Sequence, residues 1–262
     1  MLLSIVIVTK NNIAELLSTL QSISLQPLEI LNQTEVLIVS ANDIDYFGAS
    51  LSGFPFDLRF ICDDGSGLYE AMNIGLKQAN GVWLLFLNSG DCFYHHRVLN
   101  HFYITLCSAH NLDVIFGLAI VQDQHGHKWS YPSNDINVLE WLRTGALPNH
   151  QAMFFHRNFY TSNTFNTSYK ISSDSDYKIR ALSSGRFIFV NSAVCLFSIG
   201  GLSSDWTYKS LKQQCLDRYA RGLGLQDSLI CITKLIAKLV SKSIFGTRAN
   251  YLYNRYFKRN LK

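Results

Sequence analysis

The sequence predicts an α/β fold in which helices flank a mostly parallel central sheet. Residues 3–9, 36–39 and 82–87 form short, nearly uninterrupted apolar runs, which is the pattern of strands covered by helices on both faces. Segments with helical periodicity lie between these runs, at residues 13–24 and 68–79. A hydrophobic content of 48% with only four prolines fits a packed globule.

The chain divides by charge into two parts, residues 1–225 and residues 226–262. The second part holds eight Lys or Arg and one acidic residue, whereas the first holds fifteen basic and eighteen acidic residues. Lys234, Lys238 and Lys242 repeat every four residues among apolar residues, so we expect a basic amphipathic helix as a C-terminal extension. Such a helix can lie on an anionic membrane surface or dock on its own domain. We expect no nucleic-acid partner, because no recognisable binding module accompanies the charge.

The composition also predicts a cytoplasmic location. The six cysteines form no CxxC pair and no metal-like spacing, which indicates a reducing compartment and structural thiols. The first residues, MLLSIVIVTKNN, read as a strand and lack the basic leader and cleavage site of a secretion signal. No apolar run approaches the ~20 residues that a membrane-spanning helix needs.

The first strand, residues 3–9, leads into the helix predicted over residues 13–24. Asn11 or Asn12 is placed to cap this helix, because a side-chain oxygen there accepts a free amide of the first turn. A strand-to-helix turn that binds a dinucleotide carries the motif G-x-G-x-x-G. This turn lacks it, which argues against a dinucleotide-binding domain.

The most informative stretch is residues 67–91, GLYEAMNIGLKQANGVWLLFLNSGD. It reads as a helix, a buried strand and an acidic turn in immediate succession. Gly81 is expected to end the helix in a left-handed conformation, and the strand at residues 82–87 is expected to be central in its sheet. The turn from Asn88 to Asp91 then falls at the carboxyl end of a parallel strand, where open α/β sheets bind their ligands.

This stretch resembles the core signature of the family 2 glycosyltransferases, inverting nucleotide-sugar enzymes of GT-A fold. The resemblance is strongest to the branch that builds capsule, colanic-acid-type exopolysaccharide and O-antigen, whose members are similar at GLYEAMN and at LNSGD. It runs with gaps from Leu3 to about Ser204 and implies a GT-A-type, Rossmann-like sheet. The residues of the helix and strand that carry it are Gly67, Ala71, Asn73, Gly75, Ala79 and Gly81.

The resemblance implies a binding site for a nucleotide-diphosphate sugar. Ser40 stands where the family has the first acidic residue of a base-binding turn, and a serine brings no charge to that contact. Asp64 lies in a DDGS turn that either contacts the donor or is a solvated turn. A glycine-rich loop follows at residues 197–203, and it either covers the pyrophosphate or is a plain turn. The donor residues implied are Thr9, Ser40, Asp64, Asn73, Asn88, Asp91, Gly200, Gly201 and Ser203.

A divalent cation is the expected cofactor, and Asp91 is its candidate ligand. The leaving nucleoside diphosphate is strongly charged, so a cation that bridges its oxygens stabilises it. Mg²⁺ and Mn²⁺ prefer carboxylate oxygens. The family commonly offers an Asp-x-Asp turn, but here Asn88, Ser89, Gly90 and Asp91 leave one carboxylate. Alternatively, Asp91 caps a helix near residues 95–107.

Asp174 is the candidate catalytic base. An inverting transfer needs one group to accept the proton of the attacking hydroxyl, and Asp174 matches the position where the family places that carboxylate. Asp176 is the reserve candidate, and the alternative is that the segment around Asp174 only caps the helix that follows. His150 and Gln151 match a family HQ pair before a strand and are candidates for acceptor binding, although a buried histidine bonded to backbone is an equal alternative.

Together these features predict an inverting transfer from a nucleotide-diphosphate sugar to a growing glycan of a bacterial surface polysaccharide. The resemblance implies an acceptor linked to undecaprenyl diphosphate, with the enzyme peripheral on the inner face of the cytoplasmic membrane. One alternative is a catalytically silent subunit that binds nucleotide sugar or glycan, because acidic residues are missing at Ser40 and Gly90. A nucleotidyltransferase would need a basic, glycine-rich loop after the first strand, which TKNNIAEL does not supply.

Overall fold

The structure is a computed structural model of the whole chain. It describes residues 1–198, apart from residue 11 and residues 43–46, 48–50, 124, 133–136 and 145–146, and a few helical residues between 212 and 244. Residues 200, 201 and 203, the three lysines of the predicted basic helix and the boundary predicted at residue 225 lie outside the described residues. The predictions made for them therefore stay predictions.

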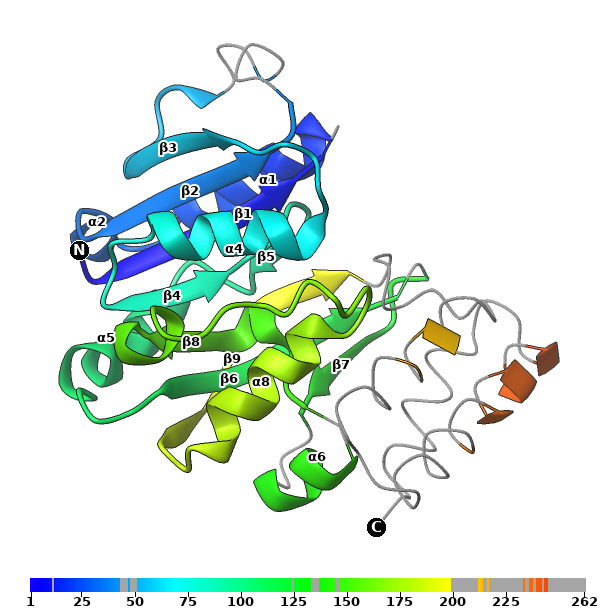
Figure 1. The fold of residues 1–262 in the computed structure, drawn as a ribbon. Helices are drawn as coiled ribbons and strands as arrows, with labels where there is room; N and C mark the ends of the chain where they lie inside the picture. Colours follow the sequence, from blue (N-terminus) through cyan, green and yellow to red (C-terminus); the bar gives the residue numbers. More distant parts are fainter. Residues whose placement is uncertain are drawn as a thin grey trace.

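One half of the central sheet is parallel and carries the amino-terminal part of the chain (Figure 1). Its strands follow the order β3-β2-β1-β4, and every neighbouring pair is parallel. All residues of β2 and β4 are buried, as the apolar runs at residues 36–39 and 82–87 predict. The bounds are β1 Leu3–Thr9, β2 Thr34–Ser40, β3 Asp57–Cys62 and β4 Trp83–Phe86.

The other half of the sheet continues from β4 in the order β8-β6-β9-β5, and β7 pairs with β6. β8 is antiparallel to both β4 and β6, whereas β6 and β9 are parallel. The longest strand of this half is β9. The bounds are β5 Cys92–Phe93, β6 Val114–Gln122, β7 Lys128–Tyr131, β8 Met153–His156 and β9 Phe187–Ser198.

Helices cover both faces of the sheet and form two separate cores. One core joins the sheet to α1 Ile13–Ser24, α2 Leu28–Leu31 and α5 Val98–Ser108. The other joins it to α4 Leu68–Gln78, α6 Val138–Thr144, α7 Arg157–Tyr160 and α8 Ser173–Ser183. The predicted α/β fold and the central place of β4 are confirmed, and the Asn12 side chain caps α1 by accepting from the Glu15 amide.

The role predicted for Gly81 is wrong. The helix α4 ends at Gln78, and Ala79 after it is already extended, with φ −71° and ψ 134°. Gly81 has no left-handed φ. Instead, a Cβ at Gly81 would lie 2.4 Å from the Ser4 amide nitrogen and 2.6 Å from the Trp83 carbonyl oxygen. Glycine is required there because two backbone segments pass too closely for any side chain.

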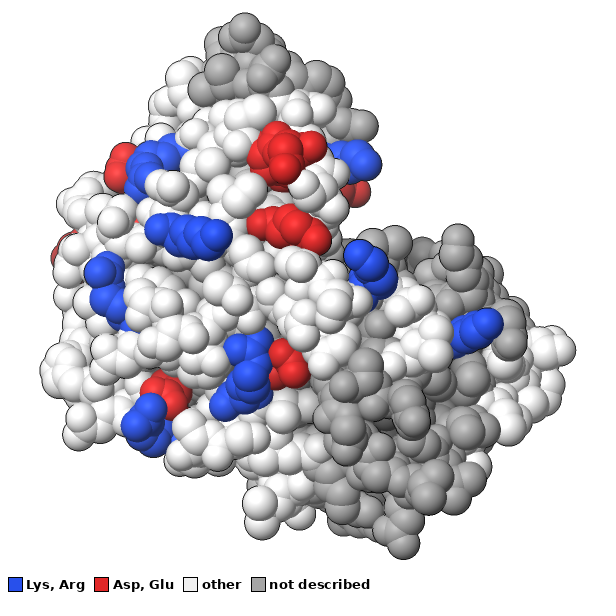
Figure 2. Space-filling view, viewed as in Figure 1, with Lys and Arg blue, Asp and Glu red and all other residues white. Residues whose placement is uncertain are grey.

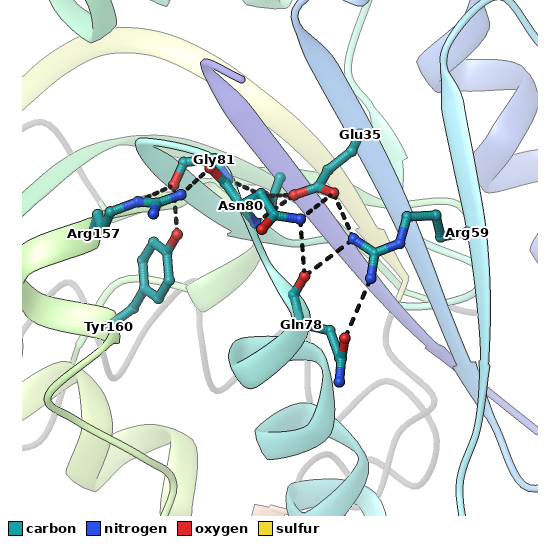
Figure 3. A network of polar contacts seen from close by, with 8 residues as sticks. Glu35, Arg59, Gln78, Asn80, Gly81, Arg157 and Tyr160 are labelled. Atoms are coloured by element: carbon teal, nitrogen blue, oxygen red, sulfur yellow. Dashed lines mark hydrogen bonds and ion pairs between the residues drawn. The ribbon is translucent and has the colours of Figure 1, made fainter.

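A buried carboxylate organises the amino end of the parallel strands (Figure 3). Glu35, only 1% exposed, accepts hydrogen bonds from Ser4 Oγ at 2.5 Å, from the Asn80 amide at 2.5 Å and from Arg59 at 3.0 Å. Arg59 also donates to the Gln78 carbonyl and side chain, and Arg157 and Tyr160 bind the neighbouring Gly81 carbonyl. The network ties the α4–β4 connection to β1, β2 and β3.

The pKa of Glu35 records how well the network satisfies this carboxylate. Burial raises the pKa, but the hydrogen bonds from Ser4, Asn80 and Arg59 outweigh it, so the pKa lies below its ordinary value of 4.5.

On the surface, basic and acidic side chains are interspersed on the face that carries α4 and α8, and no large patch of one sign covers its described part (Figure 2). None of the described helices combines the length and apolar character that crossing a membrane requires.

Candidate active site

Polar side chains gather at the carboxyl ends of β1, β2 and β4. Thr9 and Ser40 close their strands as direct register partners, and the Ser89 amide donates to the Val8 carbonyl at 3.3 Å. Asn88 follows β4 at the same edge. The structure therefore brings together four residues predicted for donor binding or the acidic turn, because parallel neighbours end at one edge of a sheet.

The acidic turn after β4 points its carboxylate inward. Gly90 has φ +92°, a left-handed conformation that suits glycine. Asp91 is 6% exposed, and its Oδ2 accepts a hydrogen bond from Gln151 Nε2 at 3.1 Å. Burial raises the pKa of Asp91 to about 7, the bond from Gln151 opposes this shift, and the charge of Glu15 adds to it. Asp91 does not cap α5, whose N-cap residue is Arg97.

One face of α1 supports this turn. The Thr19 hydroxyl accepts from the Gly90 amide at 3.0 Å and donates to the Glu15 carbonyl at 3.2 Å. Ser22 Oγ accepts from the Phe93 amide at 3.1 Å, and Ser18 Oγ lies 3.4 Å from the Cys92 sulfur. These α1 residues share a face because they are three or four positions apart. The helix therefore fixes the turn along its length.

Several buried oxygen atoms at this edge have no hydrogen-bond partner among the residues that the structure describes. They are Thr9 Oγ1, Asn88 Oδ1 and Ser89 Oγ, and the Thr9 side chain is nine-tenths buried. An unpaired buried polar group costs about 1–3 kcal/mol, so such groups are rare unless a ligand or water meets them. Three of them around one turn indicate a place for a polar ligand.

Asp174 lies in a buried polar cluster at the start of α8. Its Oδ2 is 3.1 Å from Lys178 Nζ and 3.7 Å from His150 Nδ1, and its Oδ1 is 3.4 Å from the Tyr69 hydroxyl. Burial raises the pKa of Asp174, but the Lys178 ammonium and His150 outweigh it and hold that pKa far below its usual range. The carboxylate is thus ionised, and the capping alternative is wrong, since the N-cap residue Ser172 makes no side-chain cap bond.

His150 and Gln151 connect the turn after β4 with Asp174. Both belong to the short 3-10 helix η2, His150–Ala152. His150 Nε2 lies 3.4 Å from Asn88 Nδ2 while its Nδ1 faces Asp174, and Gln151 holds Asp91. Burial lowers the pKa of His150 despite the nearby Asp174. The imidazole of His150 is therefore neutral and lies between the turn after β4 and Asp174. The alternative of a histidine bonded only to backbone is wrong.

Other predicted site residues lie outside this cluster. The Asp64 carboxylate accepts from the Ser66 amide at 3.0 Å within an exposed turn. Asn73 is bound at both ends of its amide to the Phe165 backbone, at 2.9 and 2.8 Å, which fastens α4 to a distant loop. Asp176, the reserve base, instead pairs with Arg180 at 3.0 Å. Donor contacts by Asp64 and Asn73 stay predictions.

Sequence reasoning missed three residues of the site. Lys178 follows Asp174 by four positions, a spacing that places the two side chains together on a helix and could have been recognised. Tyr69 reaches the cluster because its hydroxyl also donates to the Ile171 carbonyl at 2.6 Å. Glu15 lies near the turn only because α1 packs against it, and no local sequence pattern predicts that contact.

The family comparison agrees with this arrangement. The family model described as "Glycosyl transferase family 2" matches residues 4–177, which span the parallel strands, the acidic turn, η2 and the start of α8. The chain belongs to glycosyl transferase family 2. It is therefore a glycosyltransferase, and the resemblance noted in the sequence is confirmed at the level of the family.

Relatives and solved structures support the same family and fold. A "PGL/p-HBAD biosynthesis glycosyltransferase" of Mycobacterium bovis is 28% identical over 249 residues, covering 92% of this chain and 93% of that protein. A structure of S. aureus TarS 1-349 in complex with UDP-GlcNAc covers all of this chain and 76% of that one, with 17% identity and a TM-score of 0.62. The mannosyltransferase PcManGT from Pyrobaculum calidifontis, in complex with GDP-Man and Mn²⁺, covers 99% and 80%, with 14% identity and a TM-score of 0.59.

The residues at the turn after β4 fit a divalent cation that is held partly by other ligands. Within the described part of the chain, no three His, Cys, Asp or Glu side chains form a metal site by themselves. However, Mg²⁺ is often held by one or two carboxylates together with substrate phosphates and water. The unpartnered Asn88 Oδ1 and Ser89 Oγ, next to Asp91, are oxygen ligands of the kind that such cations prefer.

Proposed function

We propose that this family 2 glycosyltransferase moves one sugar, with inversion, from a nucleotide-diphosphate sugar to a hydroxyl of a saccharide acceptor. The acceptor is a lipid-linked oligosaccharide, of the undecaprenyl-diphosphate type, in the assembly of a bacterial surface polysaccharide such as exopolysaccharide, capsule or O-antigen. Two neighbours of the same fold are complexes with UDP-GlcNAc and GDP-Man, which supports a nucleotide-sugar donor here.

One observation carries this proposal: the short helix η2 contacts both the turn after β4, which has unpartnered oxygen atoms, and the ionised carboxylate of Asp174. The turn from Asn88 to Asp91 has unpartnered oxygens on one side of His150, and Asp174 lies on the other side. A sugar transfer needs both parts within one substrate length, since the donor and the attacking hydroxyl meet at the anomeric carbon. A site that only bound nucleotide would have no use for the second part.

Asp174 acts as the base in this proposal. As the bond to the leaving group breaks and the hydroxyl of the acceptor approaches, that hydroxyl becomes more acidic, and Asp174 takes its proton. Lys178 keeps the carboxylate charged before the reaction, and Tyr69 and His150 fix its direction.

The donor half of the site would hold the nucleotide and its pyrophosphate. Thr9 and Ser40 lie where the base and ribose are expected, and Asn88 and Asp91 follow at the pyrophosphate. A bound Mg²⁺ or Mn²⁺ supplies positive charge that stabilises the departing nucleoside diphosphate. The glycine-rich loop at residues 200–203 stays a proposed cover for this group.

The lipid-linked acceptor places the enzyme at the inner face of the cytoplasmic membrane in this proposal. The support is the basic segment at residues 226–262, because clustered Lys and Arg are attracted to anionic leaflets by roughly 1 kcal/mol each. Its apolar side would lie at the acyl boundary. A vesicle-binding assay with and without that segment tests this part separately from catalysis.

The test of the proposed function is a donor titration followed by a transfer assay. Purified protein is titrated calorimetrically with UDP-, GDP- and TDP-sugars in Mn²⁺ and then in EDTA. Saturable binding of one donor, followed by its consumption when a polyprenyl-linked saccharide is added, is the expected result. Folded protein that binds no nucleotide sugar contradicts the proposal, and binding without any transfer points to a silent subunit.

A further inference from the structure

The acidic turn of this chain has a glycine, Gly90, where a carboxylate is missing, and the side chain of Glu15 lies beside that glycine. A Cβ built on Gly90 would lie 3.5 Å from the Glu15 carboxyl carbon and 3.6 Å from its Oε2. Glu15 comes from α1, so a carboxylate from a different element stands where an acidic side chain at position 90 would extend.

The Glu15 carboxylate has no structural task in the described residues. Glu15 is the third residue of α1, and its amide is capped by the Asn12 side chain at 3.1 Å. In a full capping box the glutamate would bond back to the N-cap amide, but the capping found here is one-sided, and no hydrogen bond or ion pair of the carboxylate occurs. The side chain is exposed and lies against the turn instead.

The helix that carries Glu15 is held rigidly against the turn. Thr19, one helical turn further on, accepts from the Gly90 amide, and Ser22 accepts from the Phe93 amide. A ligand on such a helix keeps its position better than one on a loop. Within the described residues, Asn88 Oδ1 and Ser89 Oγ of the same turn are buried without partners, and the Glu15 charge lies near enough to Asp91 to raise its pKa.

We infer that Glu15 supplies the carboxylate that Gly90 lacks and acts, with Asp91, as a ligand of the divalent cation that accompanies the nucleotide. This inference rests on the proposed function and deepens it. Two carboxylates plus phosphate oxygens are a common Mg²⁺ and Mn²⁺ ligand set. It also explains why α1 keeps an unpaired, exposed carboxylate beside the one glycine of the turn.

The test measures Mn²⁺ binding directly, without relying on activity. Free Mn²⁺ is followed by electron paramagnetic resonance as it is titrated into protein with excess UDP or GDP. Three proteins are compared: wild type, Glu15→Gln, and the matched control Glu29→Gln, which removes one exposed carboxylate on α2. Thermal unfolding shows whether the variants are folded, and calorimetric nucleotide binding in EDTA tests the rest of the pocket.

The expected result is a loss of Mn²⁺ affinity in Glu15→Gln by roughly tenfold or more, because even indirect partners of a metal are worth that much. Glu29→Gln should match wild type, and nucleotide binding in EDTA should be the same in all three proteins. Equal Mn²⁺ affinity in Glu15→Gln and wild type overturns the inference. If wild type binds nucleotide but no Mn²⁺, the inference about Glu15 is also wrong, while the proposed transfer is unaffected. If wild type binds no nucleotide at all, the proposed function itself is wrong.

Discussion

The two ends of the parallel strands treat a buried carboxylate in opposite ways. At the amino end, Glu35 has partners on three sides, and its pKa is lowered. At the carboxyl end, the Asp91 carboxylate accepts one hydrogen bond from the described part of the chain, that of Gln151, and its pKa is raised to about 7. The two side chains are similarly inaccessible, at 1% and 6% exposure. Burial raises the pKa of both carboxyls and is the main cause of the raised value at Asp91, but only at Glu35 do the hydrogen bonds outweigh it.

This difference separates the scaffold from the site. A buried polar group that folding alone must support is surrounded by donors, because an unpaired one costs free energy. A group that a ligand will meet can be left incomplete, and the cost is carried by the rest of the fold. Completeness of hydrogen bonding thus distinguishes Glu35, a structural residue, from the candidate site around Asp91.

The largest effect is expected from Asp174→Asn. An amide cannot accept the proton of the attacking hydroxyl, so the kcat of transfer should fall by about 10²–10⁴-fold. Donor affinity should change little, since Asp174 lies beyond His150 from the turn. Steady-state transfer and calorimetric donor binding measure the two quantities on the same protein.

The matched control for that variant is Asp176→Asn on the same helix. Asp176 pairs with Arg180 rather than with the cluster, so its kcat should stay within a few-fold of wild type. If Asp176→Asn loses as much activity as Asp174→Asn, or if Asp174→Asn transfers normally, Asp174 is not the base.

Glu35→Gln should damage the fold and spare the site. It leaves Arg59 without its charged partner and weakens the bonds from Ser4 and Asn80, which should cost about 1–3 kcal/mol of unfolding free energy. Urea denaturation measures this loss against Glu29→Gln, an exposed change of the same charge. A large drop in kcat with unchanged unfolding free energy would contradict the assignment of Glu35 as a structural residue.

The same network predicts an acid-sensitive stability. Because the folded pKa of Glu35 lies below its ordinary value of 4.5, the unfolded state takes up a proton first as pH falls. The stabilising contribution is complete above 4.5 and is lost as pH falls through the folded pKa. Wild type should lose its advantage over Glu35→Gln in that window. A difference between them that stays constant down to about pH 3 would contradict the assignment.

The smallest effect is expected at Thr9. Its hydroxyl is buried without a partner, so Thr9→Val should leave unfolding free energy unchanged or raise it by up to about 1 kcal/mol, while donor affinity falls by a few-fold. Thr19→Val is the contrast, because that hydroxyl bonds the Gly90 amide and its loss should destabilise the protein. Denaturation of both variants checks the opposite signs, and equal effects would show that the Thr9 hydroxyl is not reserved for a ligand.

Much of the fold was predictable because buried strands have an unmistakable composition. The runs at residues 3–9, 36–39 and 82–87 are nearly all apolar, and the order of helix, strand and turn around Asn88 predicted the position of the candidate site. The capping signal narrowed the N-cap of α1 to Asn11 or Asn12, and the structure shows Asn12, since a cap depends on neighbouring residues. These features depend on residues close in sequence.

What was not predictable depends on residues far apart. The inward direction of Asp91 follows from Gln151, 60 positions away, and the approach of Glu15 to Gly90 follows from how α1 docks. Gly81 looked like a helix stop, but the close passage of β1 sets its identity. A sequence pattern shows which residue types are present, whereas the direction of a side chain is decided by packing.

The short helix η2 also bears on the order in which substrates bind. His150 and Gln151 are adjacent in sequence, yet they contact Asn88, Asp91 and Asp174. Under the proposed function, a donor seated at the turn would therefore set the surroundings of Asp174 before an acceptor arrives. Steady-state kinetics should follow an ordered sequence in which the nucleotide sugar enters first and the free nucleotide leaves last, so that the nucleotide competes with the donor alone.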